Sequence, residues 1–165
     1  MVNQSIIILG LDPGIADTGF GLIEKTNNKI RFIDTGSIQT KKTLDFCKRL
    51  EQIYEQVDNL IKKYKPDVVA VEKLYFAKNA KTALDVGHAR GVILLAIIKH
   101  KIQPLEFTPL QVKQGVCASG SASKRQVGLM VKTLLALKAV PKPDDAADAL
   151  AVAICHNNNK SFLKY

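Results

Sequence analysis

An apolar run that ends in an acid is the feature that most limits how this chain can fold. Residues 6–11 contain no polar side chain, and Asp12, Pro13 and Gly14 follow them directly. A run of this length bounded by turn-forming residues predicts a buried central strand. Burial of an unpaired carboxylate costs free energy. Asp12 is therefore either a residue that initiates a turn before Pro-Gly or part of a charged site at the carboxyl end of the strand.

The remaining pattern predicts a short meander followed by alternating helices and strands. Residues 20–23 and 30–38 contain apolar runs separated by the turn-forming Asn27-Asn28, so they extend the first strand into an antiparallel meander. Two further inner strands are expected, over residues 68–72 and 102–107. Helices are expected from Thr43 or Asp45 to Pro66, from Thr108-Pro109 onwards, and over residues 79–100, 124–137 and 144–157.

The overall order is expected to be β-β-β-α-β-α-β-α-α, without an internal repeat or a domain linker. Hairpin strands followed by strands that alternate with helices predict an α/β fold, with a mixed five-stranded sheet and helices on both faces. A length of 165 residues fits one compact domain. We expect this domain over residues 1–157, followed by a basic, loosely ordered tail over residues 158–165.

The charge of the chain indicates a polyanionic partner. Lys and Arg number 24 against 15 Asp and Glu, which gives a formal net charge of +9. In a protein of this size such an excess favours nucleic acid as the partner. A membrane is disfavoured, because no segment approaches the roughly 18 to 20 apolar residues of a membrane span and no basic amphipathic helix with a large aromatic face is present.

The compartment is expected to be the cytoplasm. The first five residues have no basic region, and the apolar run that follows them is too short for a signal peptide. The cysteines, Cys47, Cys117 and Cys155, are odd in number and widely spaced. They are expected to be free thiols in a reducing environment, and their spacing does not predict a zinc site.

Three more acids occur where a site could form. Glu72 ends the second buried strand as Asp12 ends the first, although a strand-end Glu can also face solvent or pair with Lys73. Asp145 and Asp148 are three residues apart at the start of the last helix and so share one face. The helix dipole explains an acid in the first turn. It does not explain Asp148, because the apolar residues 149–153 that follow predict a buried helix.

Together these acids predict a metal-dependent nuclease. Two acids that end separate inner strands and an acid pair on a helix can converge at one edge of a sheet. Clustered carboxylates repel one another unless divalent cations neutralise them, and ligand sets made only of oxygen suit Mg²⁺ or Mn²⁺. Two such ions can activate a water and stabilise the leaving oxygen of a phosphodiester. The surrounding basic residues would hold the phosphates.

The order and spacing of the motifs resemble the RuvC family of Holliday-junction resolvases, which has a ribonuclease H-like fold. The similarity extends over residues 6–155, and its motifs taken together are highly specific. These motifs are Leu9-Gly10-Leu11-Asp12-Pro13-Gly14 with Thr18-Gly19-Phe20-Gly21, Val71-Glu72-Lys73-Leu74-Tyr75-Phe76-Ala77-Lys78-Asn79, Gly87-His88-Ala89-Arg90-Gly91 and Asp145-Ala146-Ala147-Asp148-Ala149-Leu150-Ala151.

The resemblance implies an enzyme that cuts two strands of a four-way DNA junction in recombination and repair. It implies a homodimer, a branch-migration motor complex as a partner, and Mg²⁺ as the cofactor, which Mn²⁺ can replace. It implies that four acids bind the metal and are catalytic, namely Asp12, Glu72, Asp145 and Asp148. Lys113 and Lys124 align with basic residues that the family uses near the scissile phosphate. Tyr75 stands where the family commonly has Phe, and its ring can still stack on junction bases.

Three weaker features have two interpretations each. The small residues Ala83, Gly87 and Gly91 form a stripe that either packs on the protein's own sheet or contacts a second subunit. His88 is expected to be a structural or surface residue and not a ligand. The loop formed by residues 118–123 is either a flexible connection or, because it precedes Lys124 and Arg125, a loop that contacts phosphate; Arg125 is therefore a further candidate for DNA binding.

Two other classes of protein share part of this pattern. An actin-like ATPase or kinase has a similar Asp-x-Gly phosphate loop, but it needs two lobes and this chain has the length of one. A DNA-binding module without catalysis explains the basic charge but not the four acids. Tight ATP binding, or DNA binding without cleavage, would favour these alternatives.

Overall fold

The computed structural model of the chain describes residues 5–27, 29–73 and 80–159. Five strands and five helices occur in this part of the chain. In order they are β1 (Ser5–Asp12), β2 (Asp17–Thr26), β3 (Lys29–Gln39), α1 (Phe46–Tyr64), β4 (Val68–Glu72), α2 (Ala80–Lys99), β5 (Leu105–Phe107), α3 (Pro109–Cys117), α4 (Lys124–Leu134) and α5 (Asp144–Asn158).

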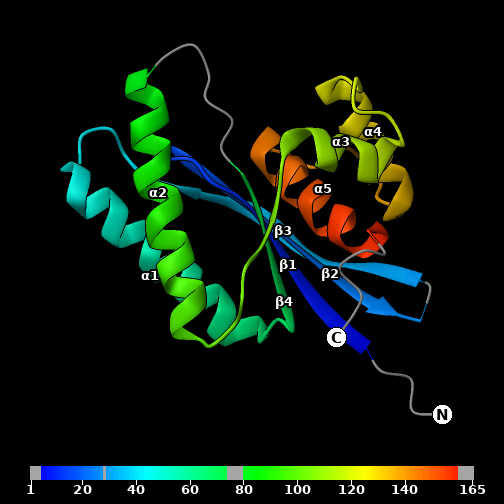
Figure 1. The fold of residues 1–165 in the computed structure, drawn as a ribbon, viewed down its shortest axis with the longest axis horizontal. Coiled ribbons are helices and arrows are strands. Elements are labelled where there is room, and N and C mark those ends of the chain that lie inside the picture. The colour runs from blue at the N-terminus through cyan, green and yellow to red at the C-terminus, as the bar shows by residue number, and fades with distance from the viewer. Residues whose placement is uncertain (1–4, 28, 74–79, 160–165) are drawn as a thin grey trace.

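The strands form one mixed sheet in the order β3-β2-β1-β4-β5. β1 and β3 are both antiparallel to β2, whereas β4 is parallel to β1 and β5 is parallel to β4. Helices α1 and α2 cover one face of the sheet, and α3, α4 and α5 cover the other (Figure 1). The predicted mixed five-stranded sheet with helices on both faces is therefore confirmed.

Each face of the sheet has its own apolar core, because alternate residues of the inner strands point to opposite sides. Leu9, Leu11 and Val71 pack with α1 and α2 in one core. Ile8 and Ala70 pack with α3, α4 and α5 in the other. Burial on both sides explains why these strands appear in the sequence as continuous apolar runs.

The structure corrects the order of elements expected after the last strand. Three helices follow β5, not two, because the helix expected from Thr108-Pro109 is an element of its own that the expected order did not count. Thr108 and Gln111 form a capping box at its start, and Ala118, with a positive φ of 56°, ends it.

Several element boundaries also differ from the expected ones. β5 covers three residues instead of residues 102–107, since Pro104 has no N–H with which to extend the ladder. α4 ends at Leu134 and not at residue 137, because the chain turns through a positive φ at Ala136. Of the two caps expected for α1, Asp45 is the one that accepts hydrogen bonds from backbone N–H groups. α5 extends to Asn158, and residues 160–165 of the expected tail lie outside the described residues.

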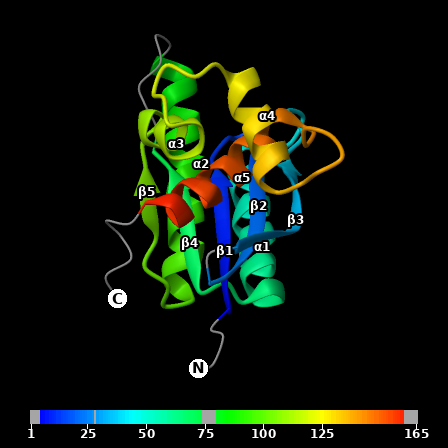
Figure 2. The same cartoon turned by 90° about the vertical axis from the view of Figure 1, so that its right-hand side faces the viewer.

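The position of α5 depends on three glycines in β1 and β2. α5 lies across these strands (Figure 2). A Cβ atom at Gly10 would lie 2.1 Å from the carbonyl oxygen of Ala149, and one at Gly19 would lie 2.0 Å from that of Asp145. At Gly21 it would lie 2.6 Å from the backbone nitrogen of Leu150. The helix backbone therefore rests directly on the strands, which is possible only where the strands lack side chains.

None of the helices in the described part of the chain is long and apolar enough to span a membrane.

We predict that Gly19→Ala displaces the first turn of α5. The added methyl group would collide with backbone atoms of Asp145, which cannot rotate away as a side chain can. Overpacking of this kind costs about 1–3 kcal/mol of unfolding free energy, and nuclease activity should fall because Asp145 moves. Urea unfolding and a cleavage assay would measure both effects. Gly91→Ala is the matched control for the unfolding measurement, because a Cβ atom there would meet nothing within 4 Å; an equal loss of unfolding free energy in both variants would contradict the prediction.

Candidate active site

Two of the predicted acids end neighbouring parallel strands. Asp12 is the last residue of β1, and Glu72 is the last residue of β4. The preceding residues, Leu11 and Val71, are direct partners in the ladder between these strands. Because both strands run in the same direction, their carboxyl ends meet at one edge of the sheet, as the sequence predicted. Asp12 and Glu72 both point to the face covered by α5, since alternate residues share a face.

The first turns of α5 add two more acids to this edge. Asp145 lies in the first turn and Asp148 follows one turn later on the same side of the helix. Three carboxylate oxygens, one each from Asp12, Asp145 and Asp148, lie within 4.8 Å of one another. Glu72 is not a member of this three-acid cluster, but its carboxyl group interacts directly with that of Asp12. The structure thus brings all four predicted acids to one place.

Burial and mutual repulsion make the carboxylates of Asp12, Glu72 and Asp145 unusually basic. The pKa of Asp12 is raised to about 9, first by burial and then by the neighbouring Glu72, Asp148 and Asp145. Burial also raises the pKa of Glu72 and of Asp145. At neutral pH a proton bound at Asp12 would relieve part of the repulsion. A divalent cation between the acids would relieve it more completely.

The donor set fits a hard divalent cation. The clustered ligand atoms are carboxylate oxygens, which suit Mg²⁺ or Mn²⁺ better than softer metals. The nearby thiol of Cys155 is not an available thiolate, because burial and then the charge of Glu72 raise its pKa to about 12. Its Sγ instead donates a hydrogen bond to the carbonyl oxygen of Gln111, at 3.3 Å. The three cysteines are free thiols, as expected.

Basic side chains flank the acids. Lys124 is the first residue of α4, whose N-terminus is capped by Ser123, and its Nζ lies 2.7 Å from Oδ2 of Asp148. This ion pair raises the pKa of Lys124. The charges of Lys124 and Lys113 also oppose the rise in the pKa of Glu72. Both lysines line a hollow of about 260 Å³ together with Glu72 and Asp148.

The other candidate residues have varied positions. Arg125 lines a neighbouring hollow of about 390 Å³ with Lys124 and Asp148. Tyr75 lies outside the described residues. The side chain of His88 is exposed and meets the ring of Phe46 edge-on at 5.5 Å between centroids, in agreement with a surface role.

The loop before α4 has local hydrogen bonds of its own. The hydroxyl groups of Ser119 and Ser121 are 3.0 Å apart, and Ser123 forms a capping box with Gln126. The serines therefore order the turn and the start of α4, which carries Lys124 and Arg125. A contact between this loop and phosphate stays a prediction.

The role of the glycines under α5 was missed by the sequence analysis. Gly10 and Gly21 are direct partners in the ladder of β1 and β2, and Gly19 is the partner of Asp12. All three face α5. The available signal was the spacing of glycines at alternate strand positions, which indicates close approach of another backbone, combined with the alanine-rich sequence of the last helix.

A mixed sheet of this order, with acids from two strand ends and one helix, defines an enzyme of the ribonuclease H-like fold. A family model described as crossover junction endodeoxyribonuclease RuvC matches residues 8–156. The chain belongs to this family. The actin-like ATPase and the non-catalytic module are thereby set aside.

Individual relatives agree along nearly the whole chain. The crossover junction endodeoxyribonuclease RuvC of Halothermothrix orenii is 56% identical over 154 residues, or 93% of each sequence. That of Natranaerobius thermophilus is 54% identical over 152 residues, which cover 92% of this chain and 94% of the relative. The solved structure of Thermus thermophilus RuvC in complex with a Holliday junction substrate is similar with a TM-score of 0.83 and 31% identity, covering 93% of each chain.

We predict that Asp12→Asn stabilises the protein at about pH 8 in the presence of EDTA. The pKa of Asp12 in the folded state, about 9, lies above its ordinary value of 3.8. The folded state therefore binds more protons than the unfolded state, and its stability falls as pH rises between these values. Asn is neutral throughout and avoids this loss. We expect a gain of at least about 1 kcal/mol, or roughly 2–4 °C in Tm.

The gain should disappear near pH 3.5, where Asp12 is protonated in both states. Thermal unfolding followed by circular dichroism across this range would test it. A gain that is equal at acidic and at alkaline pH would show that the charge of Asp12 is not its cause.

Proposed function

We propose that the protein acts in the cytoplasm and resolves four-way DNA junctions by paired, metal-dependent hydrolysis of two phosphodiester bonds. The observation that carries this proposal is the cluster formed by Asp12, Asp145 and Asp148, flanked by basic side chains, in a member of the RuvC family. The junction as substrate is supported by the Thermus thermophilus relative, which was solved with one. A branch-migration motor complex stays a predicted partner.

The acids have the role of metal ligands in this proposal. Asp12 is central, because its carboxylate lies beside Glu72 and also within the cluster with Asp145 and Asp148. Two Mg²⁺ ions would be held there, and Mn²⁺ could replace them. When bound, such ions activate a water and stabilise the leaving oxygen of the phosphodiester. Burial among α5 and the ends of β1 and β4 holds the carboxylates in place before the metal binds.

The lysines and Arg125 have the role of phosphate contacts. Lys113 and Lys124 line the same hollow as Glu72 and Asp148, so a phosphate that reaches the acids also meets these cations. Lys124 is 59% exposed at its side chain while paired with Asp148, and it can therefore turn to a phosphate when a cation replaces it at the carboxylate. We include Tyr75 as a base-stacking residue on the basis of the family motif.

The two cuts require two active sites, because one chain carries one set of these acids. We therefore propose a homodimer, since a two-fold axis relates the equivalent strands of a junction. The exposed face of α2 is a suitable contact surface. Five of its exposed residues are separated alternately by four and three positions, which is the spacing of a coiled-coil seam. They are Leu84, His88, Gly91, Leu95 and Ile98.

The exposed face of α2 overlaps only in part with the stripe of small residues, Ala83, Gly87 and Gly91, that the sequence predicted as a contact. Gly91 faces open space and so does not pack on the protein's own sheet. Gly87 and Ala83 are only half-buried and lie beside the exposed face. Leu84 and Leu95 are 65% and 53% exposed, so a second copy that packs on this face would remove apolar surface from water, which supports the proposal.

We predict that Asp12→Asn abolishes junction cleavage and leaves junction binding intact. Asn keeps the shape of the side chain but loses the charge that holds the metal, so the rate should fall by at least about 100-fold. Cleavage of synthetic four-way junctions, flaps and linear duplexes in Mg²⁺ would measure rate and selectivity. Asp144→Asn is the matched control, since this exposed neighbour pairs with Lys142 and not with the cluster. Near-normal cleavage by Asp12→Asn, or cleavage by the wild type in excess EDTA, would overturn the metal mechanism.

We predict that Lys113→Ala and Lys124→Ala each weaken junction binding and reduce its salt dependence. Loss of one phosphate contact should lower the slope of log affinity against log salt by about 1. Binding in Ca²⁺ by anisotropy at several salt concentrations would measure the slope. Lys48→Ala is the control, because Lys48 lies on α1 across the sheet and pairs with Glu51. Unchanged slopes and rates for both variants would make these lysines ordinary surface residues.

We predict that Leu95→Glu converts a dimer into a monomer. The substitution places two like charges at the centre of the apolar seam, which is costly in a desolvated contact. Sedimentation would detect the dissociation, and a cruciform plasmid would show single nicks in place of paired cuts. Leu134→Glu is the control, because Leu134 is also exposed, at 39%, but is the last residue of α4. A wild-type protein that sediments as a monomer both free and on junction DNA, yet makes paired cuts, would exclude the dimer.

A further inference from the structure

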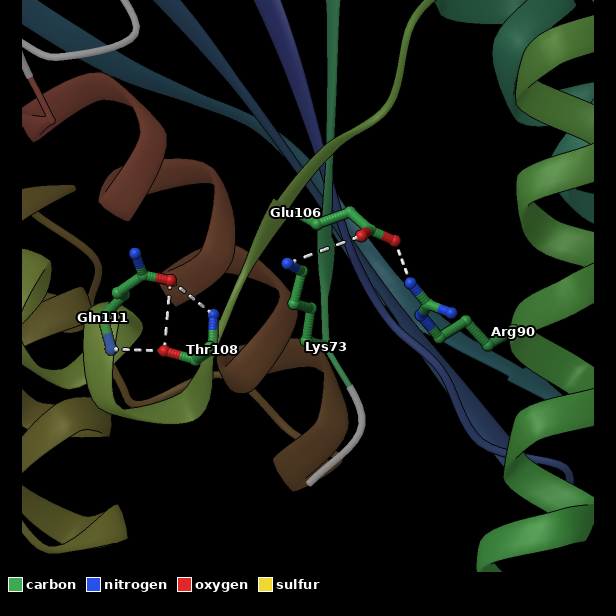
Figure 3. Close-up of polar contacts among 5 residues, drawn as sticks. All are labelled: Lys73, Arg90, Glu106, Thr108 and Gln111. Atoms are coloured by element: carbon green, nitrogen blue, oxygen red, sulfur yellow. Dashed lines mark hydrogen bonds and ion pairs between the residues drawn. The ribbon is translucent and has the colours of Figure 1, made fainter. Parts of the chain in front are cut away.

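A single carboxylate joins three elements on the side of the sheet away from the acid cluster. Glu106, in the middle of β5, accepts a hydrogen bond from the guanidinium group of Arg90 on α2. Its other oxygen lies 3.8 Å from Nζ of Lys73, the residue that follows β4 (Figure 3). Glu106 therefore connects β5, the end of β4 and α2.

The charges of this cluster depend on Glu106. Arg90 and Lys73 are both cations, and they are held on either side of one carboxylate. The side chains of Arg90 and Glu106 are only 24% and 27% exposed, so water screens their interaction incompletely. Nε of Arg90 is buried without a hydrogen-bond partner among the described residues. Loss of the Glu106 charge would leave two cations that repel each other and a guanidinium group with one partner fewer.

The cluster adjoins Glu72 in the chain. Lys73 follows Glu72 directly, and the N–H of Lys73 donates to the carbonyl oxygen of Phe107 at 2.8 Å. β5 thus holds Lys73 twice, through the backbone at Phe107 and through the side chain at Glu106. These two contacts fix the chain at the point where β4 ends.

Glu106 does not itself face the acids. It is the ladder partner of Val71, and Glu72 is that of Phe107. Val71 belongs to the core beneath α1 and α2, whereas Phe107 belongs to the core beneath α5. Glu106 therefore lies on the face opposite the site, and it can influence Glu72 only through the position of β4.

The same strand leads into the helix that carries Lys113. Thr108 follows Phe107 and caps α3: its N–H donates to Oε1 of Gln111 at 2.8 Å, and its hydroxyl accepts from the N–H of Gln111 at 3.2 Å (Figure 3). β5 is therefore held on one side by the Glu106 cluster and continues into a capped helix on the other.

We propose that Glu106 is a positioning residue of the nuclease site. Through Lys73 and Arg90 it fixes the end of β4 against α2, and so it holds Glu72 beside Asp12. This inference rests on the proposed function, because it takes Glu72 to be a metal ligand. Glu106 does not touch the metal or the DNA in this role, and its effect is therefore expected first in metal affinity.

Mn²⁺ binding to the DNA-free protein, followed by electron paramagnetic resonance, provides the test. Outer groups that orient metal ligands typically contribute 10–100-fold to affinity, and Glu106→Gln should weaken Mn²⁺ binding by on the order of 10-fold. The cleavage rate should fall at low Mg²⁺ and recover as Mg²⁺ is raised, while junction affinity in Ca²⁺ stays at the wild-type value.

Glu24→Gln is the matched control. Glu24 also pairs with an arginine, Arg31, and accepts a hydrogen bond from Ser5. It lies in β2 opposite Ile7, whereas the acid cluster lies at the other end of this ladder, where Asp12 pairs with Gly19. Mn²⁺ affinity should be unchanged in this variant. An equal loss of affinity in both variants would overturn the proposal, because the effect would then be one of general stability.

Lys73→Gln removes the contact between Lys73 and Glu106 from its more exposed side. It tests the positioning role of Glu106 even if Glu106→Gln fails to fold. The side chain of Lys73 is 47% exposed, so its loss should not prevent folding. We expect weaker Mn²⁺ binding in Lys73→Gln, and in the double variant a loss smaller than the sum of the two single losses, since both act through one contact. The proposal is overturned if Lys73→Gln folds and binds Mn²⁺ as the wild type does, while Glu106→Gln either binds Mn²⁺ equally well or fails to fold.

Glu72→Gln separates this inference from the proposed function. If Glu72→Gln weakens Mn²⁺ binding and Glu106→Gln does not, the positioning role is wrong and the metal site stands. If Glu72→Gln itself binds Mn²⁺ as the wild type does, the assignment of Glu72 as a ligand is wrong, and the positioning role is overturned with it.

Discussion

The direct contact between the backbone of α5 and the strands β1 and β2 is the constraint on which the rest of the structure depends. Gly10, Gly19 and Gly21 leave room for the helix, and the alanines on its buried side add little bulk. This contact brings Asp145 and Asp148 to the carboxyl end of β1, where Asp12 lies. A helix held further from the strands could not bring Asp145 and Asp148 to Asp12 and so could not complete the acid cluster.

The site that this contact creates opposes folding. Carboxylates gathered in a partly buried space lose hydration and repel one another, and the raised pKa of Asp12 reflects first its burial and then that repulsion. The apolar cores on the two faces of the sheet supply the compensating free energy, because hydrophobic burial is the main favourable contribution to folding. The fold thus maintains an arrangement of acids whose repulsion a proton at Asp12 and the ion pair with Lys124 relieve in part, and a bound divalent cation would relieve more completely. Functional sites commonly reduce stability in this way.

The sequence predicted the sheet and the four acids because both depend on local patterns. A continuous apolar run that ends in Asp12 or Glu72 already implies a strand end at a sheet edge. The close approach of α5 and the ion pair between Lys124 and Asp148 depend on residues far apart in the chain, and periodicity does not report such distances. The helix after Thr108 illustrates the same point: its cap and the Pro at its first position indicated it from the sequence, although the expected order of elements counted only two helices after β5.

The two faces of the sheet carry different functional features. The face under α5 holds the acids and the lysines, and the face under α1 and α2 carries α2, whose outer side offers an apolar seam. β4 lies between these layers, with Glu72 pointing to one and Val71 to the other. The ion pair of Arg90 with Glu106 is a direct polar link from α2 to the strand beside β4. This link connects α2, through β5, to the strand end that carries Glu72, whereas α5 meets the same site from the opposite face.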